Sequence, residues 1–214
     1  MTPQEANKLT EELCRRAPVV PVLVVDDVAH ARPLAEALIE GGLPALEVTL
    51  RTPVALDVIR EMAQVEGGIV GAGTLLTPQD VLNVIEAGAK FGVSPGATET
   101  LMDACEANDL PTLFGSATSS GAMRLLERGY TSQKFFPAEI NGGVPALKAI
   151  GSPIQDVMFC PTGGVSPQNA PEYLALSNTM CVGGSWVAPK KMMEAGDWKG
   201  IRELAEEAAA LTAA

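Results

Sequence analysis

Short apolar runs alternate with helix-like stretches along the whole of this 214-residue chain. The runs are rich in valine, isoleucine and leucine, which is typical of strands buried on both faces of a parallel sheet. Strands are expected at residues 19–25, 45–50, 68–72, 91–94, 110–114, 132–136, 157–160 and 179–182. Helices are expected at residues 3–16, 28–40, 54–64, 99–107, 120–127, 144–150, 167–176 and 198–211, and from Pro78 onward with Thr77 as the N-cap.

This alternation predicts an α/β protein with a single (β/α)8 barrel and an N-terminal helix. A doubly wound open sheet uses the same strand–helix units and is the alternative, but eight strands favour the barrel. Apolar residues make up 47% of the chain and charged residues 19%, which is enough apolar material for one large core. No linker or low-complexity tract interrupts the pattern, so residues 1–214 are expected to form one domain.

The overall charge limits the partners that the chain can have. A formal net charge of −11 argues against binding to nucleic acid or to an anionic membrane. It leaves room for a phosphorylated substrate, because backbone amides can bind phosphate locally. The first 16 residues have no apolar segment followed by a small-residue cleavage site, and the cytoplasm is therefore the expected compartment.

The residues that usually bind metals or nucleotides are sparse. The four cysteines have no metal-finger or CxxC spacing and are expected to be reduced and mostly buried. His30 is the only histidine and lies in a helical stretch, so a carboxylate is the expected general acid or base. The chain contains no Rossmann, Walker, EF-hand or HExxH pattern, and neither a cofactor nor a metal is expected.

Lys134 begins an apolar stretch, Lys134-Phe135-Phe136-Pro137. A lysine in this position either extends its ammonium group to water or is desolvated. Desolvation favours the neutral amine, which is the form that attacks a ketone to make a Schiff base. If Lys134 faces inward, Phe136 has the same parity and lines the wall beside it, while Phe135 packs outward against helices.

Glu47, Thr49 and Arg51 have one parity on the second strand and therefore share a face. A structural ion pair between Glu47 and Arg51 is one interpretation. The other is catalysis, because burial disfavours the charged form of a carboxylate and prepares it for proton transfer.

Glycine-rich turns follow the seventh and eighth strands, at Thr162-Gly163-Gly164 and Gly183-Gly184-Ser185. Barrels commonly bind phosphate at this place, through backbone amides that converge on the anion. Each pair of glycines could be an ordinary turn, but their position after the last two strands favours a phosphate site. Thr74 and Pro95 read first as turn residues at other strand ends.

Six segments in this order resemble the KDPG (2-keto-3-deoxy-6-phosphogluconate) aldolase family, and they span nearly the whole chain. They are residues 46–52, 71–74, 94–96, 134–139, 159–164 and 183–186. The family's fold is the same barrel, usually as a homotrimer. The resemblance implies a class I aldolase of the Entner–Doudoroff pathway, which needs no metal or other cofactor, with pyruvate and a phosphorylated keto-acid sugar as ligands.

The resemblance also implies a role for each matching residue. Lys134 corresponds to the Schiff-base lysine and Glu47 to the proton shuttle. Substrate-binding roles fall to three groups: Arg51 and Thr74 for the carboxylate of the keto acid, Pro95, Phe136 and Thr162 for the pocket wall, and Gly163, Gly164, Gly184 and Ser185 for the phosphate. One segment departs from the family pattern: residues 114–118 read FGSAT, where a proline–glycine pair is expected. The loop after the fifth strand and the preference for the substrate tail are thereby put in question.

Several other functions remain open from the sequence. A sister aldolase acting on the galactonate epimer or on 4-hydroxy-2-oxoglutarate would use the same lysine. A non-catalytic barrel that binds phosphosugars would need neither Lys134 nor Glu47. A phosphosugar isomerase would use a glutamate and a histidine, for which His30 is poorly placed.

Overall fold

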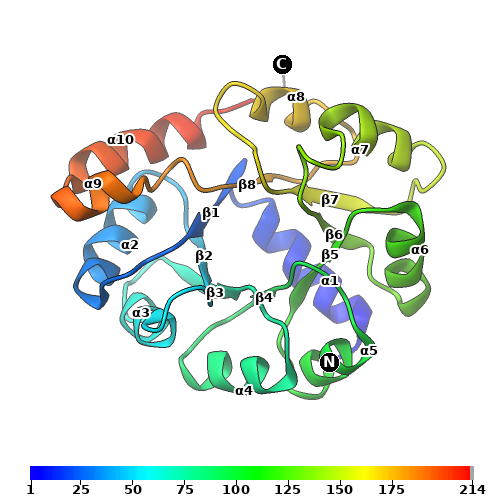
Figure 1. The fold of residues 1–214 in the computed structure, drawn as a ribbon, viewed down its shortest axis with the longest axis horizontal. Coiled ribbons are helices and arrows are strands. Elements are labelled where there is room, and N and C mark those ends of the chain that lie inside the picture. Colours follow the sequence, from blue (N-terminus) through cyan, green and yellow to red (C-terminus); the bar gives the residue numbers. More distant parts are fainter. Residues whose placement is uncertain (213–214) are drawn as a thin grey trace.

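The computed structural model of the chain describes residues 1–212. Eight parallel strands form one continuous sheet in the order β7-β6-β5-β4-β3-β2-β1-β8. Isolated bridges between Phe159 and Thr179 and between Thr162 and Gly183 join the two ends of the sheet, which closes it into a ring (Figure 1). The expected (β/α)8 barrel with an N-terminal helix is therefore confirmed, and the open-sheet alternative is wrong.

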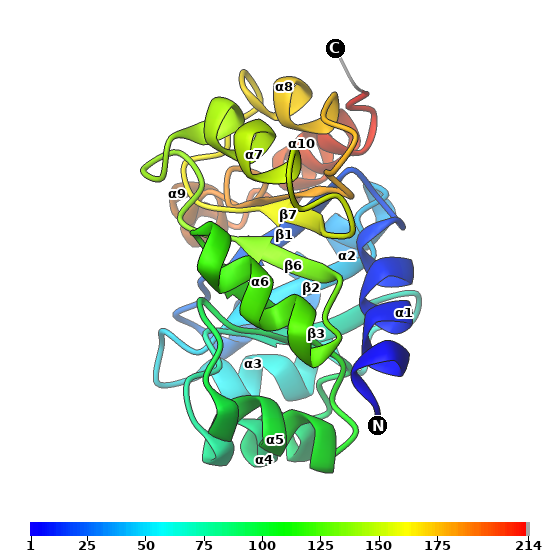
Figure 2. The ribbon, with the colours of Figure 1, turned by 90° about the vertical axis from the view of Figure 1, so that its right-hand side faces the viewer.

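The strands are β1 Val19–Leu23, β2 Ala45–Thr49, β3 Ile69–Gly73, β4 Gly92–Val93, β5 Thr112–Ser116, β6 Ser132–Phe135, β7 Met158–Pro161 and β8 Val182–Gly184. The α-helices are α1 Pro3–Cys14, α2 Ala31–Glu40, α3 Ala55–Met62, α4 Pro78–Glu86, α5 Glu99–Ala107, α6 Ser119–Arg128, α7 Gly143–Gly151, α8 Ala170–Leu174, α9 Lys190–Ala195 and α10 Trp198–Ala209, and a short 3₁₀ helix, η1, spans Val28–His30. Helices α2 to α10 surround the ring, as the side view in Figure 2 shows.

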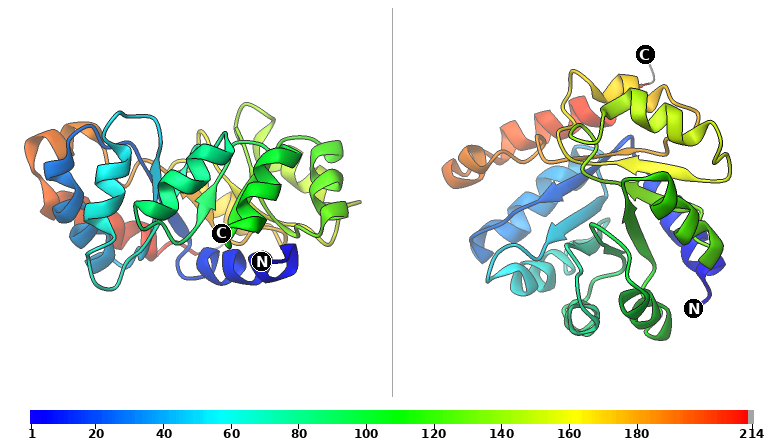
Figure 3. Two further views of the ribbon diagram at one scale, coloured as in Figure 1. Left: turned by 90° about the horizontal axis from the view of Figure 1, so that it is seen from below. Right: turned by 45° about the vertical axis from the view of Figure 1, so that its right-hand side comes forward.

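Helix α1 lies across the end of the barrel where the strands begin (Figure 3). Its residues Leu13 and Cys14 pack into an apolar cluster inside the barrel with Val20, Phe91 and other strand side chains. The helix is held at its start by a capping box between Thr2 and Glu5. This end of the barrel is thus filled by side chains, and the opposite end is left to hold a site.

A second and larger core lies between the strands and the surrounding helices. Phe135 belongs to it, is fully buried and contacts Phe159 edge to face at 6.2 Å between ring centroids. The outward packing expected for Phe135 is therefore confirmed. Its neighbour Lys134, with the opposite parity, must point into the barrel.

Several boundaries differ from those predicted. The fifth strand begins at Thr112 rather than Leu110, because Pro111 has no amide hydrogen to give to the ladder. The eighth strand begins at Val182 rather than Thr179. Helix α8 begins at Ala170, since residues 167–169 form a turn first, and helix α9 after Pro189 was not predicted.

The N-cap expected at Thr77 is confirmed: its hydroxyl accepts from the amide of Asp80, and the Asp80 carboxylate accepts in return from the amide of Thr77. All four cysteines are buried and none forms a disulfide, as expected. In the part of the chain that the structure describes, no helix has both the length and the apolar character needed to cross a membrane.

Candidate active site

A cavity of about 320 Å³ opens at the carboxyl ends of the strands. It is lined by Val22, Glu47, Thr49, Arg51, Thr74, Pro95, Lys134, Phe136, Thr162, Gly163, Gly164, Val165, Gly183 and Ser185. All but one of the site residues expected from the sequence lie on its wall. The exception is Gly184, whose neighbour Gly183 lines the cavity instead; a methyl group added at Gly184 would meet the ring of Trp186.

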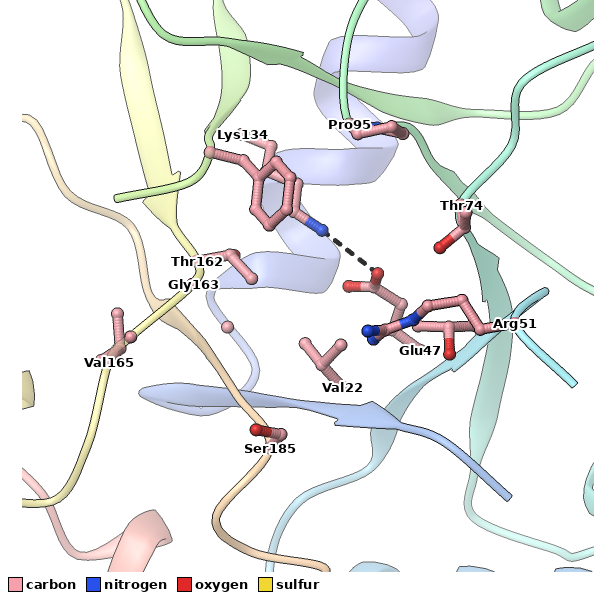
Figure 4. A pocket seen from close by; sticks show the side chains of 14 residues that line it. Val22, Glu47, Arg51, Thr74, Pro95, Lys134, Thr162, Gly163, Val165 and Ser185 are labelled. Carbon is pink, nitrogen blue, oxygen red and sulfur yellow. Dashed lines mark hydrogen bonds and ion pairs between the residues drawn. The ribbon is translucent and has the colours of Figure 1, made fainter. Parts of the chain in front are cut away.

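Lys134 and Glu47 meet at the floor of the cavity (Figure 4). They come from β6 and β2, on opposite sides of the ring, and Lys134 Nζ donates a hydrogen bond to Glu47 Oε1 over 3.2 Å. Only 5% of Lys134 and 3% of Glu47 are exposed. The ammonium nitrogen also lies 5.3 Å from the centroid of the Phe136 ring, so this ring is the wall beside the lysine. A Glu47–Arg51 ion pair was one of two interpretations of the sequence; in the structure Glu47 pairs with Lys134 instead.

Burial controls the acidity of Glu47. Desolvation raises the pKa of this carboxyl above its ordinary value of about 4.5, although the positive charges of Lys134 and Arg51 act in the opposite direction. A carboxyl group with a raised pKa gives and takes protons more readily near neutral pH than an exposed glutamate does. The environment of Glu47 therefore suits proton transfer to and from a neighbouring atom.

Glycine at position 73 makes the room that Glu47 occupies. A methyl group at Gly73 would overlap the Glu47 carboxylate oxygen Oε1 and lie 2.8 Å from its Cγ. Gly115 likewise makes room for a neighbour, since a methyl group there would overlap the carbonyl of Pro95. This close approach explains why the segment 114–118, which departs from the family pattern, still carries a glycine at position 115.

Arg51 and Thr74 lie on one side of the Lys134–Glu47 pair, and Gly163, Val165 and Ser185 on the other (Figure 4). Within residues 1–212, no carboxylate forms a salt bridge with Arg51, so its charge is free to bind an anion. Thr74 has φ +67, in the left-handed region that costs a threonine about 1–3 kcal/mol. Strain of this kind commonly occurs at binding sites, where it aims a side chain.

Comparison with known proteins gives the affiliation of the chain. A sequence profile described as KDPG and KHG aldolase matches residues 10–204. The chain belongs to this aldolase family. It is 52% identical to the 2-dehydro-3-deoxy-phosphogluconate aldolase of Pseudoalteromonas atlantica, over 94% of each chain. It is 51% identical to the KHG/KDPG aldolase of Escherichia coli K12, over 92% of this chain and 93% of that one.

Solved structures of the same family have the same fold. The KDPG aldolase of Zymomonas mobilis ZM4, determined with 3-phosphoglycerate, superposes with a TM-score of 0.92 at 47% identity and covers 97% of this chain and 98% of its own. The KDPG aldolase of Legionella pneumophila, in which pyruvate was captured at low pH as a covalent carbinolamine intermediate, has a TM-score of 0.91 at 42% identity, with coverages of 94% and 98%.

The aldolase pocket contains four residues that were not predicted as site residues: Val22, Thr49, Val165 and Gly183. Thr49 has the parity of Glu47 and could have been included on that ground; its hydroxyl donates to the carbonyl of Leu23 over 2.8 Å. Gly183 leaves space for the Thr162 side chain. His30 does not line the pocket and instead borders a separate cavity with Asp26 and Glu194.

Gly73→Ala is expected to lower kcat by roughly a hundredfold, because the added methyl group displaces the Glu47 carboxylate and misplaced catalytic groups cost about this much. The matched control is Gly96→Ala, whose methyl group would meet nothing within 4 Å. Steady-state kinetics of the two variants measure the effect. Equal activities would mean that the position of Glu47 does not matter to turnover.

The pH dependence of turnover should report the raised pKa of Glu47. A glutamate that accepts a proton must first be ionised, and a raised pKa delays ionisation to higher pH. The acid limb of kcat/KM is therefore expected above pH 4.5, the ordinary pKa of glutamate. It should vanish in Glu47→Gln. An acid limb that is the same in Glu47→Gln would assign it to another group.

Proposed function

We propose that this chain is a class I aldolase that cleaves 2-dehydro-3-deoxy-6-phosphogluconate to pyruvate and glyceraldehyde 3-phosphate, the aldol step of the Entner–Doudoroff pathway. It also cleaves 4-hydroxy-2-oxoglutarate to pyruvate and glyoxylate. The observation that carries the proposal is the buried pair of Lys134 and Glu47, with Nζ and Oε1 3.2 Å apart at the floor of the family's pocket.

The first steps make the covalent intermediate. Glu47 accepts a proton from the Lys134 ammonium group, and the free amine attacks the C2 ketone of the substrate. Glu47 passes this proton to the ketone oxygen to give a carbinolamine. A second proton moves from the nitrogen to the new hydroxyl group, which leaves as water and gives an iminium ion, with Glu47 again ionised. Arg51 and Thr74 hold the substrate carboxylate, and Phe136, Pro95 and Thr162 form the wall around the reacting carbons.

The iminium ion then serves as the electron sink for cleavage. Glu47 removes the proton of the C4 hydroxyl, the C3–C4 bond breaks, and its electron pair moves toward the iminium nitrogen to form an enamine. Glyceraldehyde 3-phosphate leaves as the aldehyde. Glu47 returns the proton to C3, and water hydrolyses the imine to release pyruvate and regenerate Lys134.

The other end of the pocket suits a phosphate. Gly163 and Gly164 have φ angles of +98 and +80, a backbone that an L side chain rarely adopts, and Ser185 adds a hydroxyl. These residues would bind the substrate phosphate through amides and a hydroxyl, without Gly184, which does not line the cavity. We further propose that residues 1–214 are one domain, that it assembles as a homotrimer, and that it acts in the cytoplasm without nucleic acid or membrane partners.

The position of His30 argues against an isomerase, because the histidine that such an enzyme needs lies outside the pocket. The buried Lys134–Glu47 pair argues against a purely binding role, since a desolvated ion pair is costly and phosphosugar binding does not require it.

The test is cleavage of purified substrates, followed through the release of pyruvate. We expect the highest kcat/KM with 2-dehydro-3-deoxy-6-phosphogluconate, a lower value with 4-hydroxy-2-oxoglutarate and a lower one again with the galactonate epimer. Release of pyruvate from none of the three would contradict the proposal. A preference for the epimer would keep the chemistry and change the substrate.

A further inference from the structure

The loop after β7, residues 162–165, is held through its carbonyl groups. The carbonyl of Thr162 accepts from the amide of Ala138 over 2.8 Å, and that of Gly163 accepts from the amide of Glu139 over 3.1 Å. The next carbonyl, that of Gly164, accepts from a side chain, Asn169 Nδ2, over 3.2 Å. Three consecutive carbonyls are thus fixed by donors, and only the last donor is a side chain.

These bonds decide where the amide hydrogens point. The peptide bonds in this loop are trans, so each N–H points opposite to the carbonyl of the preceding residue. The N–H of Gly163 follows the Thr162 carbonyl, next to the bridge that Thr162 forms with Gly183. The N–H groups of Gly164 and Val165 have no hydrogen-bond partner among residues 1–212, and both residues line the pocket.

Asn169 sets the orientation of the second of these free donors, the N–H group of Val165. Its Nδ2 holds the carbonyl of Gly164, and its Oδ1 accepts from the amide of Ser166 over 2.8 Å. One side chain therefore forms hydrogen bonds to the peptide groups on both sides of Val165. Glu139 supports the loop from below: a methyl group on Gly164 would come within 2.6 Å of Glu139 Cγ, and the Glu139 carboxylate accepts from the Tyr173 hydroxyl.

We propose that Asn169 is a positioning residue that turns the Val165 amide into the pocket as a donor to the phosphate group of the substrate. Asn169 itself lies outside the pocket and does not touch the substrate. Preorganised amides bind an anion better than mobile ones, because no ordering cost is paid on binding. This inference rests on the proposed function, since the anion is the substrate phosphate.

Loss of the Asn169 side chain should affect the KM of phosphorylated substrates but not that of substrates without a phosphate. Asn169→Ala frees the Gly164–Val165 peptide and should raise KM for the phosphorylated substrate about tenfold, the effect of about 1.4 kcal/mol. The KM for 4-hydroxy-2-oxoglutarate and the trapping of pyruvate by borohydride should change less than about twofold. The matched control, Gln168→Ala, removes the neighbouring side chain, for which no hydrogen bond is found within residues 1–212.

A second measurement is independent of turnover. Titration of the ¹⁵N-labelled protein with inorganic phosphate should shift the amide resonances of Val165 and Gly164, with an affinity about tenfold weaker in Asn169→Ala. Asn169→Asp keeps the acceptor for Ser166 but loses the donor to Gly164, so it should lose at least as much affinity.

Three results would overturn the inference: equal losses with both substrates, no loss with either, or phosphate binding by Asn169→Asp that matches the wild-type protein. Failure of the proposed function has a different signature, because the wild-type chain would then neither release pyruvate nor form a pyruvate adduct. In that case the phosphate titration still tests whether Asn169 orients the Val165 amide.

Discussion

Lys134→Met should abolish turnover, with a loss of at least about 10⁴-fold, the scale seen when a covalent nucleophile is removed. Methionine has a similar length and fits an apolar pocket, but it has no nitrogen to form the imine. The fold should persist, because Glu47 loses its partner and becomes protonated, a response that the burial of its carboxyl already favours. Pyruvate release measures the loss, and circular dichroism checks the fold.

The control for this variant is Lys90→Met, which removes an exposed lysine away from the pocket. Its turnover should match that of the wild-type protein. Near-normal turnover by Lys134→Met would refute the Schiff-base mechanism, and Lys134 would then be a structural lysine paired with Glu47.

Glu47→Gln should slow turnover by about two to four orders of magnitude, the usual loss when a general acid–base is removed. Glutamine keeps the size of the side chain and can still accept a hydrogen bond from Lys134, but it cannot take the proton of the C4 hydroxyl. The loss should fall on kcat more than on KM, since the substrate is held by other residues. Single-turnover kinetics would separate imine formation from carbon–carbon cleavage.

A different outcome for Glu47→Gln would support the structural interpretation of the ion pair. If the variant only lowers the melting temperature and keeps its kcat, then Glu47 serves to satisfy the buried lysine. Gly73→Ala also separates the two interpretations, because it displaces the Glu47 carboxylate without removing its charge. A loss of kcat in this variant would support the catalytic interpretation.

The barrel could be predicted because its strands are buried on both faces and therefore appear as apolar runs. Parity along β6 also put Lys134 and Phe135 on opposite sides, so that an inward Lys134 implied an outward Phe135. The start of β5 was missed because apolar character does not reveal which backbone amides are free to pair, and Pro111 has none. Helix α9 was missed because its six residues give too short a period to recognise.

The pocket was predicted less completely than the fold. The proximity of Lys134 and Glu47, 87 residues apart, was implied only by their roles in the resembling aldolases, because parity along β2 by itself offers Arg51 as the partner of Glu47. Gly183 rather than Gly184 faces the cavity. Neighbouring positions on a strand point to opposite sides, so an error of one residue exchanges the inner and outer positions. The hydrogen bonds of Asn169 to Gly164 and Ser166 depend on the path of the turn before α8. This turn was predicted as helix.

The proposed mechanism depends on an imine between Lys134 and the keto acid. The most direct measurement is treatment of the protein with sodium borohydride in the presence of pyruvate, followed by peptide mass spectrometry. We expect a reduced pyruvyl adduct on Lys134 and none in the Lys134→Met variant. No adduct, or an adduct on Lys90 or Lys148 instead, would contradict it.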